Sequence, residues 1–389
     1  MSDSSFDCLG GNYYISAASL LLEYRGFIDS HATLSKVNCA NPYWSIIAKY
    51  CRELEGYPEL LRQITKIHLS SQIDFERALF CSWSSLLVSL LLRLPESQQK
   101  AIFLAGLLQD VGKYSSTNTI NDDNELGSEG LKLRCNNRLG YDEHPLRSAI
   151  RAETALPHVE GLSDLILHHH AREDGTGYPM NVGESQLGID NQILIISNEL
   201  SDLLDKWGGH NQLIHVLPVL KLNSFLYFDR VHFFWIKLFE PHIAVQVTIN
   251  DRDSLYDNVK KKVESLEGML SCLLIISAEF VLYDYDVVVH GMRMMIRRLA
   301  YLSTDTGIFD PVLFQQKVYH AKNNDNDVIR DLDSILKGLP EILIRIEMFI
   351  DEILNTKKYD VNVSLLQGAK SQLHKNIKNL EGRRCSIFR

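Results

Sequence analysis

The chain has no excess of basic residues. Its 389 residues include 40 Lys and Arg against 49 Asp and Glu, which gives a formal net charge of −9 at pH 7. A surface that binds nucleic acid in general needs a basic footprint, because the binding energy comes largely from neutralising phosphates. We therefore expect no nucleic-acid partner, although a local pocket for a phosphate-bearing small molecule remains compatible with this charge.

The chain has few cysteines, and their spacing is irregular. The seven cysteines are an odd number, and no two of them form a Cys-x-x-Cys pair. An even number of cysteines is typical of a disulfide framework, and closely spaced Cys pairs are typical of a thiolate zinc site. The pattern suggests neither and fits reduced thiols best, so we expect a cytoplasmic protein.

Long hydrophobic runs are also missing. The most apolar stretches, residues 86–94 and 270–282, are shorter than the run of about 20 residues that a membrane-spanning helix needs. The first seven residues carry serine and acid but no basic segment of the kind that opens a secretory signal. We expect neither a membrane span nor a secretory signal.

Helical periodicity dominates what is there. Apolar residues recur at helical spacing through residues 12–66, 75–94, 97–112, 145–154, 159–170 and 189–207. The clearest stripe covers residues 329–354, where Pro340 should kink or split the helix. This stripe fits either core packing or the seam of a homodimer. The sequence therefore predicts an all-α protein.

One block, from His168 to Pro179, points to chemistry. Three adjacent histidines end an apolar run, and the sequence Asp-Gly-Thr-Gly-Tyr-Pro follows after three further residues. Neighbouring imidazoles at a helix end can bind one metal ion or two adjoining ions. Gly175 and Gly177 can take backbone angles that other residues avoid, and Pro179 fixes the exit. The block predicts a metal site beside a tight loop.

Further candidate ligands lie at the ends of other predicted helices. Asp110 and Lys113 end one helix, His144 opens the next, and Glu199 lies with Asp202 in a later one. Carboxylates can bridge metal ions, imidazoles suit transition metals, and a lysine can neutralise phosphate. Each residue alone is also compatible with an ordinary helix surface, so the prediction depends on their order and spacing together.

These motifs resemble those of the HD-GYP family, a branch of the HD-domain metal-dependent phosphohydrolases. The family's His-Asp-x-Gly-Lys motif is similar to Gln109-Asp110-Val111-Gly112-Lys113, and its His-His-Glu-x-x-Asp-Gly-x-Gly-Tyr-Pro motif to His169 through Pro179. Its His-Pro step resembles His144-Pro145, and its Asp-x-x-Asp helix resembles the segment from Glu199 to Asp202.

The resemblance implies an HD-domain-like helical bundle with additional N- and C-terminal helical regions. The expected division is a helical lead-in over residues 1–70, an HD-GYP-like domain over 71–320 and a C-terminal helical region over 321–389. Within the domain, the core spans 75–205 and an inserted segment spans about 208–284. The implied activity is hydrolysis of cyclic di-GMP, a bacterial second messenger, at a site holding iron or manganese.

The chain departs from the family pattern in one half of that site. Gln109 stands where the family has the histidine of its His-Asp pair, and the upstream family histidine falls near Cys81. Ala171 follows the paired histidines in place of glutamate, and Glu199 stands at the position of a metal aspartate. The residues that the family clusters around one metal are all present: Asp110, His144, His169 and His170.

Two functions follow from this pattern. The first is a degenerate member of the family that regulates cyclic-di-GMP signalling by binding the nucleotide or a partner protein, with weak or no hydrolysis and with a single metal ion or none. The second is an active phosphodiesterase whose metal site is completed by Cys81, Glu199 or one of three further residues, His68, Glu76 and His158.

Roles are assigned accordingly. Asp110 and Lys113 are the expected catalytic residues, and Cys81 and Gln109 are the substituted ligand positions. The expected metal ligands are Asp110, His144, His169, His170 and Glu199. The expected loop for a partner or nucleotide contains Asp174, Gly175, Gly177, Tyr178 and Pro179.

Overall fold

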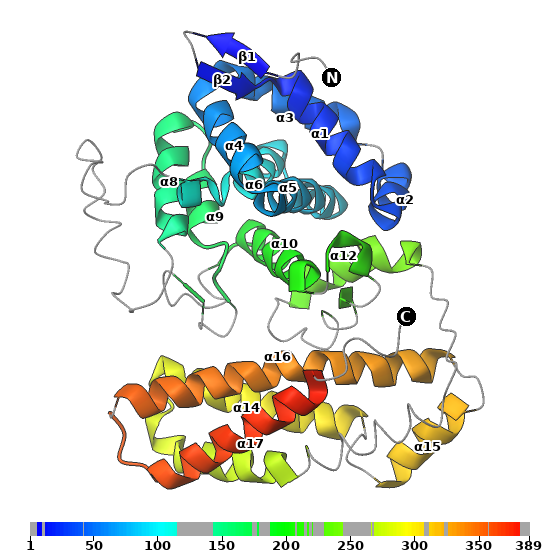
Figure 1. Cartoon of the computed structure of the whole chain (residues 1–389), viewed down its shortest axis with the longest axis vertical. Coiled ribbons are helices and arrows are strands. Elements are labelled where there is room, and N and C mark those ends of the chain that lie inside the picture. Colours follow the sequence, from blue (N-terminus) through cyan, green and yellow to red (C-terminus); the bar gives the residue numbers. More distant parts are fainter. Residues whose placement is uncertain are drawn as a thin grey trace. The chain divides into compact units, whose positions relative to one another are not determined.

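The chain divides into two compact helical units. The first comprises Met1–Leu217 with Leu226–Ala244, and the second Pro218–Phe225 with Val245–Arg389 (Figure 1). Apart from one short hairpin, the regular structure of the described residues is helical, which confirms the predicted all-α class. The computed structural model describes residues 6–9, 12–41, 43–114, 143–172, 177–178, 187–206, 208–213, 216–217, 220, 229–243, 266, 268–306, 311–322, 326–356 and 358–381.

The first unit begins with a two-stranded hairpin that the sequence did not predict. Strands β1 (Phe6–Leu9) and β2 (Asn12–Ile15) pair antiparallel, with Phe6 opposite Ile15. The backbone N–H of Ile15 donates to the hydroxyl of Thr65 at 2.8 Å, and Thr65 lies in helix α4 (Pro58–Ser70). This buried hydrogen bond ties the hairpin to the helices that follow it.

Helices α1 (Ala17–Asp29), α2 (Ala32–Ala40) and α3 (Trp44–Glu53) lie between the hairpin and α4. The side chain of Ser16 caps α1 by accepting from the backbone N–H of Ser19, which satisfies one of the free donors at a helix start. Pro58 opens α4, where its fixed backbone angle suits the first turn.

Helices α5 (Gln72–Leu91) and α6 (Glu96–Leu108) form the centre of the first unit (Figure 1). Residues 78–89 of α5 are all buried, including the polar Ser82, Ser84, Ser85 and Ser89. Three of these hydroxyls, those of Ser82, Ser84 and Ser89, donate to backbone carbonyls within the helix, so they enter the core without losing hydrogen bonds. The helices can approach closely because α6 presents Gly106 to Ser82.

The remaining helices of the first unit surround this pair. A short 3-10 helix (Val111–Tyr114) packs on α8 (His144–Ala155), and α8 packs on α9 (Leu162–Leu167). Helix α10 (Ile189–Lys206) packs on α5, and α12 (Asp229–Phe239) contacts both of them. Several helix ends therefore meet beside the buried α5–α6 pair.

The second unit is built from longer helices. It contains α14 (Val287–Thr306), α15 (Pro311–Lys322), α16 (Asn326–Thr356) and α17 (Val363–Glu381), together with a helical stretch over residues 268–279. Helix α16 continues through Pro340, so the proline does not split it. The apolar stripe of α16, including Ile342, Ile346 and Ile350, is buried in a unit where α16 packs on α14 and α17.

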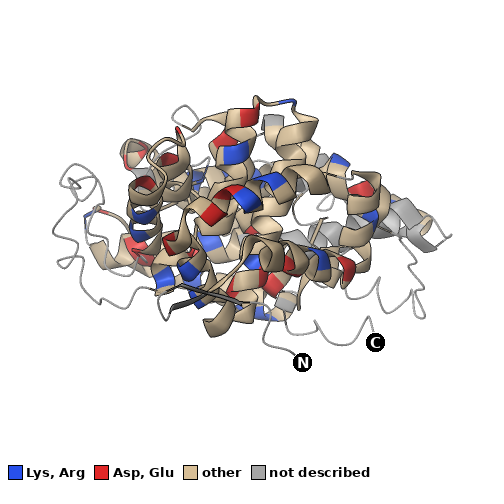
Figure 2. Cartoon of the chain, turned by 90° about the horizontal axis from the view of Figure 1, so that it is seen from above, with Lys and Arg blue, Asp and Glu red and all other residues tan. Residues whose placement is uncertain are grey.

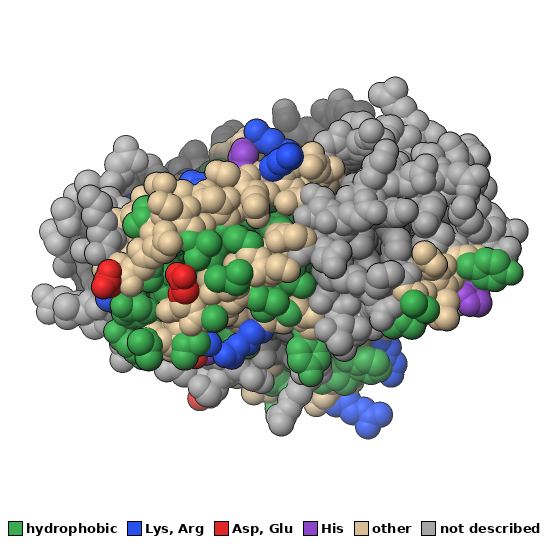
Figure 3. Space-filling view, turned by 90° about the horizontal axis from the view of Figure 1, so that it is seen from below, with side chains coloured by type: hydrophobic (Ala, Val, Ile, Leu, Met, Phe, Trp, Pro, Cys, Tyr) green, Lys and Arg blue, Asp and Glu red, His purple; other side chains and the backbone are tan. Residues whose placement is uncertain are grey.

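Core packing therefore accounts for the described part of that stripe, and the homodimer stays a prediction. Figure 3 shows hydrophobic side chains on the visible described surface. The large exposed apolar residues of the second unit include Leu282, Tyr285, Tyr301 and Tyr319.

Charges of both signs are interspersed on the described helices, as Figure 2 shows. Of the helices that the structure describes, none combines the length and apolar character that a membrane span requires.

The close approach of α5 and α6 predicts a large difference between two glycine substitutions. A Cβ atom at Gly106 would lie 2.6 Å from the backbone nitrogen of Ser82, whereas no atom lies within 4 Å of a Cβ placed at Gly26 in α1. Gly106→Ala should lower the free energy of unfolding by about 2 kcal/mol. Gly26→Ala should raise it by about 0.5–1 kcal/mol. Urea denaturation of both variants measures this, and equal effects would contradict the packing.

Burial of His210 predicts a loss of stability in acid. The ring lies 4.9 Å from those of Phe27 and Phe80, and burial lowers the histidine pKa to about 3, with the charges of His31 and Arg77 lowering it further. The unfolded chain binds this proton near pH 6.5. Stability should therefore fall as pH drops from about 6.5 to 3, by about 1.4 kcal/mol per pH unit.

Substitution isolates this contribution. In His210→Phe, the loss of unfolding free energy between pH 7.5 and pH 4.5 should be smaller than in the unsubstituted chain by about 2 kcal/mol. Urea denaturation at the two pH values gives both differences. An identical loss in both proteins would show that His210 is not the group responsible.

Candidate metal centre

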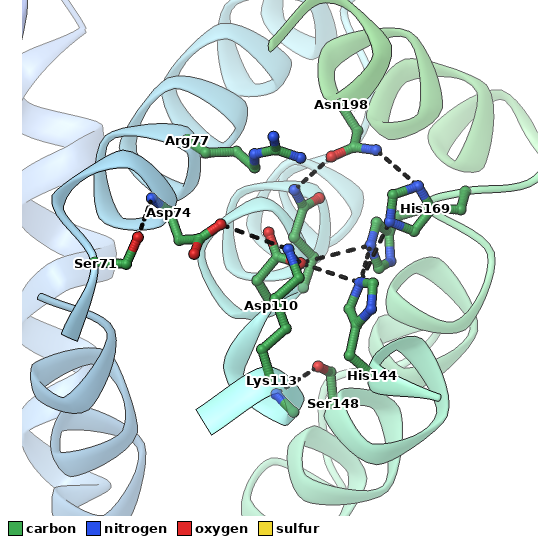
Figure 4. A network of polar contacts seen from close by, with 12 residues as sticks. Ser71, Asp74, Arg77, Asp110, Lys113, His144, Ser148, His169 and Asn198 are labelled. Atoms are coloured by element: carbon green, nitrogen blue, oxygen red, sulfur yellow. Dashed lines mark hydrogen bonds and ion pairs between the residues drawn. The ribbon is translucent and has the colours of Figure 1, made fainter. Parts of the chain in front are cut away.

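Three imidazoles converge where α8 begins and α9 ends. His144 is the first residue of α8, and His169 and His170 follow α9 by two and three residues. The Nε2 atom of His144 lies 3.2 Å from that of His169 and 3.3 Å from that of His170. One ring nitrogen from each histidine lies within 4.8 Å of the other two. These three residues are called the histidine cluster below, and Figure 4 shows part of it.

The backbone fixes the orientation of His169. Its Nδ1 lies 2.6 Å from the carbonyl oxygen of Ile166, which can only accept, so Nδ1 carries the proton and Nε2 presents a lone pair to the cluster. Burial lowers the pKa of this histidine to about 3; His144 lowers it further, while Asp110 opposes the shift. The ring is therefore neutral near pH 7, which is the form that binds metals.

Asp110 adds a carboxylate to the cluster. Its Oδ1 lies 2.9 Å from Nζ of Lys113, 3.1 Å from Nε2 of His144 and 4.0 Å from Nε2 of His169. Burial alone raises the pKa of this carboxyl, but the hydrogen bond from His144 and the charge of Lys113 bring it well below its ordinary value. Its Oδ2 has no hydrogen-bond partner among the described residues.

Gly112 brings Asp110 and Lys113 to the start of α8. A Cβ atom at this position would lie 2.5 Å from the carbonyl oxygen of His144 and 2.8 Å from the backbone nitrogen of Ser148. The backbone N–H of Gly112 donates to the hydroxyl of Ser148 at 2.8 Å. Only glycine permits this approach, which explains its place between the aspartate and the lysine.

Gly177 and Tyr178 cover the other side of the cluster. The ring of Tyr178 stacks on that of His170, with centroids 4.5 Å apart and an angle of 14° between the planes. A Cβ atom at Gly177 would lie 2.3 Å from the carbonyl oxygen of His170, so glycine is needed for this contact. The other predicted loop residues, Asp174, Gly175 and Pro179, lie outside the described residues.

This set of atoms fits a metal ion. Ligands at about 2.0–2.2 Å from a metal, at angles between about 90° and the tetrahedral angle, lie about 2.8–3.6 Å apart. The spacings of 3.2 and 3.3 Å between imidazole nitrogens fall in this range. Nitrogen lone pairs and an ionised carboxylate in a buried site need shared protons or a cation between them. His144, His169, His170 and Asp110 could together hold one ion.

The substituted ligand positions offer poorer donors. Cys81 is fully buried in α5, and burial raises the pKa of its thiol to about 12, although the charge of Arg77 opposes this. Metals bind the thiolate, so a protonated thiol is a weak ligand. Gln109 is also fully buried, and its Nε2 donates to Oδ1 of Asn198 at 3.0 Å.

A fixed positive charge lies in this same half of the site. Arg77 precedes Cys81 by one helical turn in α5, and its guanidinium forms ion pairs with Asp202 and, at 2.8 Å, with Asp205. It also interacts electrostatically with Asp110 and Cys81. Figure 4 shows its side chain among the residues of the polar network.

Glu199 lies against a different partner. Its Oε1 is 2.9 Å from Nε and 2.8 Å from the terminal nitrogen Nη2 of Arg172, so the carboxylate forms an ion pair in the structure. The sequence alternatives also have other contacts: His158 lies 3.1 Å from the hydroxyl of Tyr57, Glu76 accepts from Gln72, and His68 packs on Phe75. Glu199 as a ligand stays a prediction.

Sequence reasoning missed Arg77 and Asn198. Asn198 directly precedes Glu199 in α10, and neighbouring helical residues point about 100° apart, so one position decides which side chain faces the histidines. The motif alone does not determine which of the two side chains faces the histidines. Arg77 could have been found because it precedes the substituted Cys81 by four residues, which places both on one face of a helix.

Part of the chain is similar to known proteins. Residues 59–230 match the family described as HD domain. A cyclic di-GMP phosphodiesterase of Pseudomonas aeruginosa is 27% identical over 135 residues. The match covers 34% of this chain and 31% of that protein. No solved structure matches.

The matched range contains the histidine cluster, Asp110, Lys113 and the helices that position them, from α4 to the start of α12. HD domains are generally metal-dependent, which agrees with a buried set of imidazole and carboxylate donors. Residues 59–230 of this all-α chain are therefore similar to HD domains.

Proposed function

We propose that the chain is a degenerate HD-GYP protein that binds cyclic di-GMP or a partner protein as a regulatory module, with weak or no hydrolysis. The observation that carries the proposal is the contrast between the two halves of the site. The histidine cluster and Asp110 converge within metal-ligand spacing, whereas Cys81 and Gln109 present a protonated thiol and a hydrogen-bonded amide.

One iron or manganese ion would be held by His144, His169, His170 and Asp110. When bound, such an ion polarises a phosphate oxygen and activates water. Lys113 lies 2.9 Å from Asp110, and although burial lowers the pKa of its ammonium, Asp110 reverses the shift and raises it. The lysine therefore stays protonated and supplies a positive charge suited to a phosphate group.

The same geometry disfavours a second ion. Arg77 keeps its charge at all accessible pH values and interacts with both Asp110 and Cys81. A divalent cation in this half would be repelled by that charge. It would also find the Cys81 thiol and the Gln109 amide in place of imidazoles. Two-metal sites use both ions to stabilise the attacking and leaving oxygens. A single ion leaves one of these charges without support, which explains weak or absent hydrolysis.

The alternative function is an active phosphodiesterase with an altered metal site. It is favoured by the name of the relative from Pseudomonas aeruginosa, a cyclic di-GMP phosphodiesterase. In that case Asp110 and Lys113 act as catalytic residues. Glu199 breaks its ion pair with Arg172 and binds the metal. The proposal also includes a cytoplasmic location and domain boundaries at residues 70 and 320. It places a surface for a partner protein at the Gly-Tyr-Pro loop.

Metal and turnover measurements decide between these functions. After anaerobic purification, the chain should carry about one iron or manganese ion, because one half of the site lacks metal donors. It should bind cyclic di-GMP in calorimetry without releasing linear dinucleotide or GMP. Two ions per chain together with product release would establish the active phosphodiesterase instead.

The ligand assignment has its own test. His169→Ala and His170→Ala should abolish metal uptake, because each removes one of the converging nitrogens. His374→Ala is the matched control, since His374 is an exposed histidine of α17 and should leave uptake unchanged. Unchanged uptake in His169→Ala and His170→Ala would overturn the assignment.

The stack of Tyr178 on His170 predicts a graded effect on metal affinity. Tyr178→Ala removes the ring that holds His170 in its plane, so manganese should bind about tenfold more weakly. Tyr178→Phe keeps the stacked ring and should bind as tightly as the unsubstituted chain. Calorimetric titration with manganese measures both, and equal affinities of the two variants would contradict a positioning role for the ring.

A further inference from the structure

We propose that Gln109 and Asn198 form an amide relay that sets the tautomer of His170. Gln109 thereby supports metal binding at the histidine cluster although it is not itself a ligand. The proposal rests on the single metal ion of the proposed function. It concerns two residues outside the histidine cluster. Both are positioning residues that act on the site through His170.

The relay is a continuous chain of polar contacts. Nε2 of Gln109 lies 3.0 Å from Oδ1 of Asn198, and Nδ2 of Asn198 lies 3.2 Å from Nδ1 of His170. Gln109 and Asn198 are no more than 1% exposed, so solvent does not offer alternative partners to their side chains. Figure 4 shows Asn198 at one end of the polar network, hydrogen-bonded on both sides of its amide group.

Metal ligation constrains the direction of this chain. A neutral imidazole carries one proton, so a metal bound to Nε2 of His170 requires the proton on Nδ1. Nδ1 then donates, and Asn198 must present its carbonyl oxygen. The amide nitrogen of Asn198 then faces Gln109, which must in turn present its own carbonyl oxygen.

Gln109 has the free acceptor that this direction needs. Its Oε1 is buried and has no hydrogen-bond partner among the described residues. Half-turns of the two amide groups exchange their oxygen and nitrogen atoms at nearly the same positions. The hydrogen bonds then run from His170 to Asn198 and from Asn198 to Gln109, and Oε1 of Gln109 gains a donor.

Each direction of the relay therefore corresponds to one tautomer of His170. In one direction, Asn198 donates to Nδ1 and the proton of His170 lies on Nε2, 3.3 Å from Nε2 of His144. In the other, Nδ1 is the donor and Nε2 is free to bind metal. Tyr178 fixes the plane of the same ring by stacking. The amides determine which nitrogen of that ring carries the proton.

An amide suits this role because it offers both a donor and an acceptor and does not titrate near neutral pH. Partners of this kind behind a metal-binding histidine usually change metal affinity by 10- to 100-fold when removed. The relay thus gives a physical reason for a glutamine at position 109, beside the histidine cluster and Asp110.

The test is a calorimetric titration of the full chain, purified free of metal, with manganese(II) and without nucleotide. Asn198→Leu should weaken binding about 10- to 100-fold, because His170 loses the acceptor for its Nδ1 proton. Asn198→Asp keeps an acceptor at that place and should bind at least as tightly as the unsubstituted chain. Gln109→Leu should weaken binding, and combining it with Asn198→Leu should add little, because the two residues act in series.

Gln192→Leu is the matched control for loss of a buried amide. Gln192 lies in α10 like Asn198, but its Nε2 donates to the carbonyl oxygen of Leu187, away from the histidine cluster. Its removal should reduce stability and leave manganese affinity unchanged. A general disturbance of the helix would instead weaken binding in Gln192→Leu as well, which would contradict the relay.

A second readout reports the tautomer directly. With zinc(II), which is diamagnetic, nitrogen-15 NMR of the histidine side chains should show His170 protonated on Nδ1 in the unsubstituted chain and in Asn198→Asp. Equal manganese affinities of Asn198→Leu and the unsubstituted chain, or equal losses in Asn198→Leu and Asn198→Asp, would overturn the relay alone. Failure of the unsubstituted chain to bind manganese would overturn both the relay and the single-metal site.

Discussion

The structure of the site depends on the close approach of three imidazoles and one carboxylate, of which all but His170 are buried. Nε2 of His144 lies within 3.3 Å of a nitrogen from each of two other imidazoles and 3.1 Å from the carboxylate of Asp110. Without a metal these donors share protons, and a cation among them could take the place of those protons. The protein maintains the arrangement because the four donors belong to three packed helix ends, those of α6, α8 and α9.

Glycines make that packing possible. Gly106 brings α6 against α5, Gly112 brings the Asp110 turn against α8, and Gly177 brings Tyr178 onto His170. Each avoids a backbone clash at less than 3 Å that any larger residue would cause. The metal-type donors are therefore positioned by close backbone approaches, while the half containing Cys81, Gln109 and Arg77 is filled by a thiol, an amide and an ion-paired guanidinium.

Much of this could be predicted from the sequence, because helical periodicity and short motifs are local signals. The all-α class is confirmed, and the predicted cluster residues His144, His169 and His170 lie together in the structure. The contacts of Asn198 and Arg77 were not predicted, because they depend on which helix faces meet in space. The hairpin over residues 6–15 was not predicted either, and a non-local hydrogen bond from Ile15 to Thr65 ties it to the helices. The ion pair of Glu199 with Arg172 is non-local in the same way.

X-ray absorption spectroscopy of the manganese- or iron-loaded chain tests the central claim most directly, because it counts the scatterers around the metal itself. The account predicts a mononuclear centre with imidazole scattering from the histidine cluster and no metal–metal contribution. A second metal at about 3.5–4 Å, the separation of two-metal phosphohydrolase sites, would contradict it.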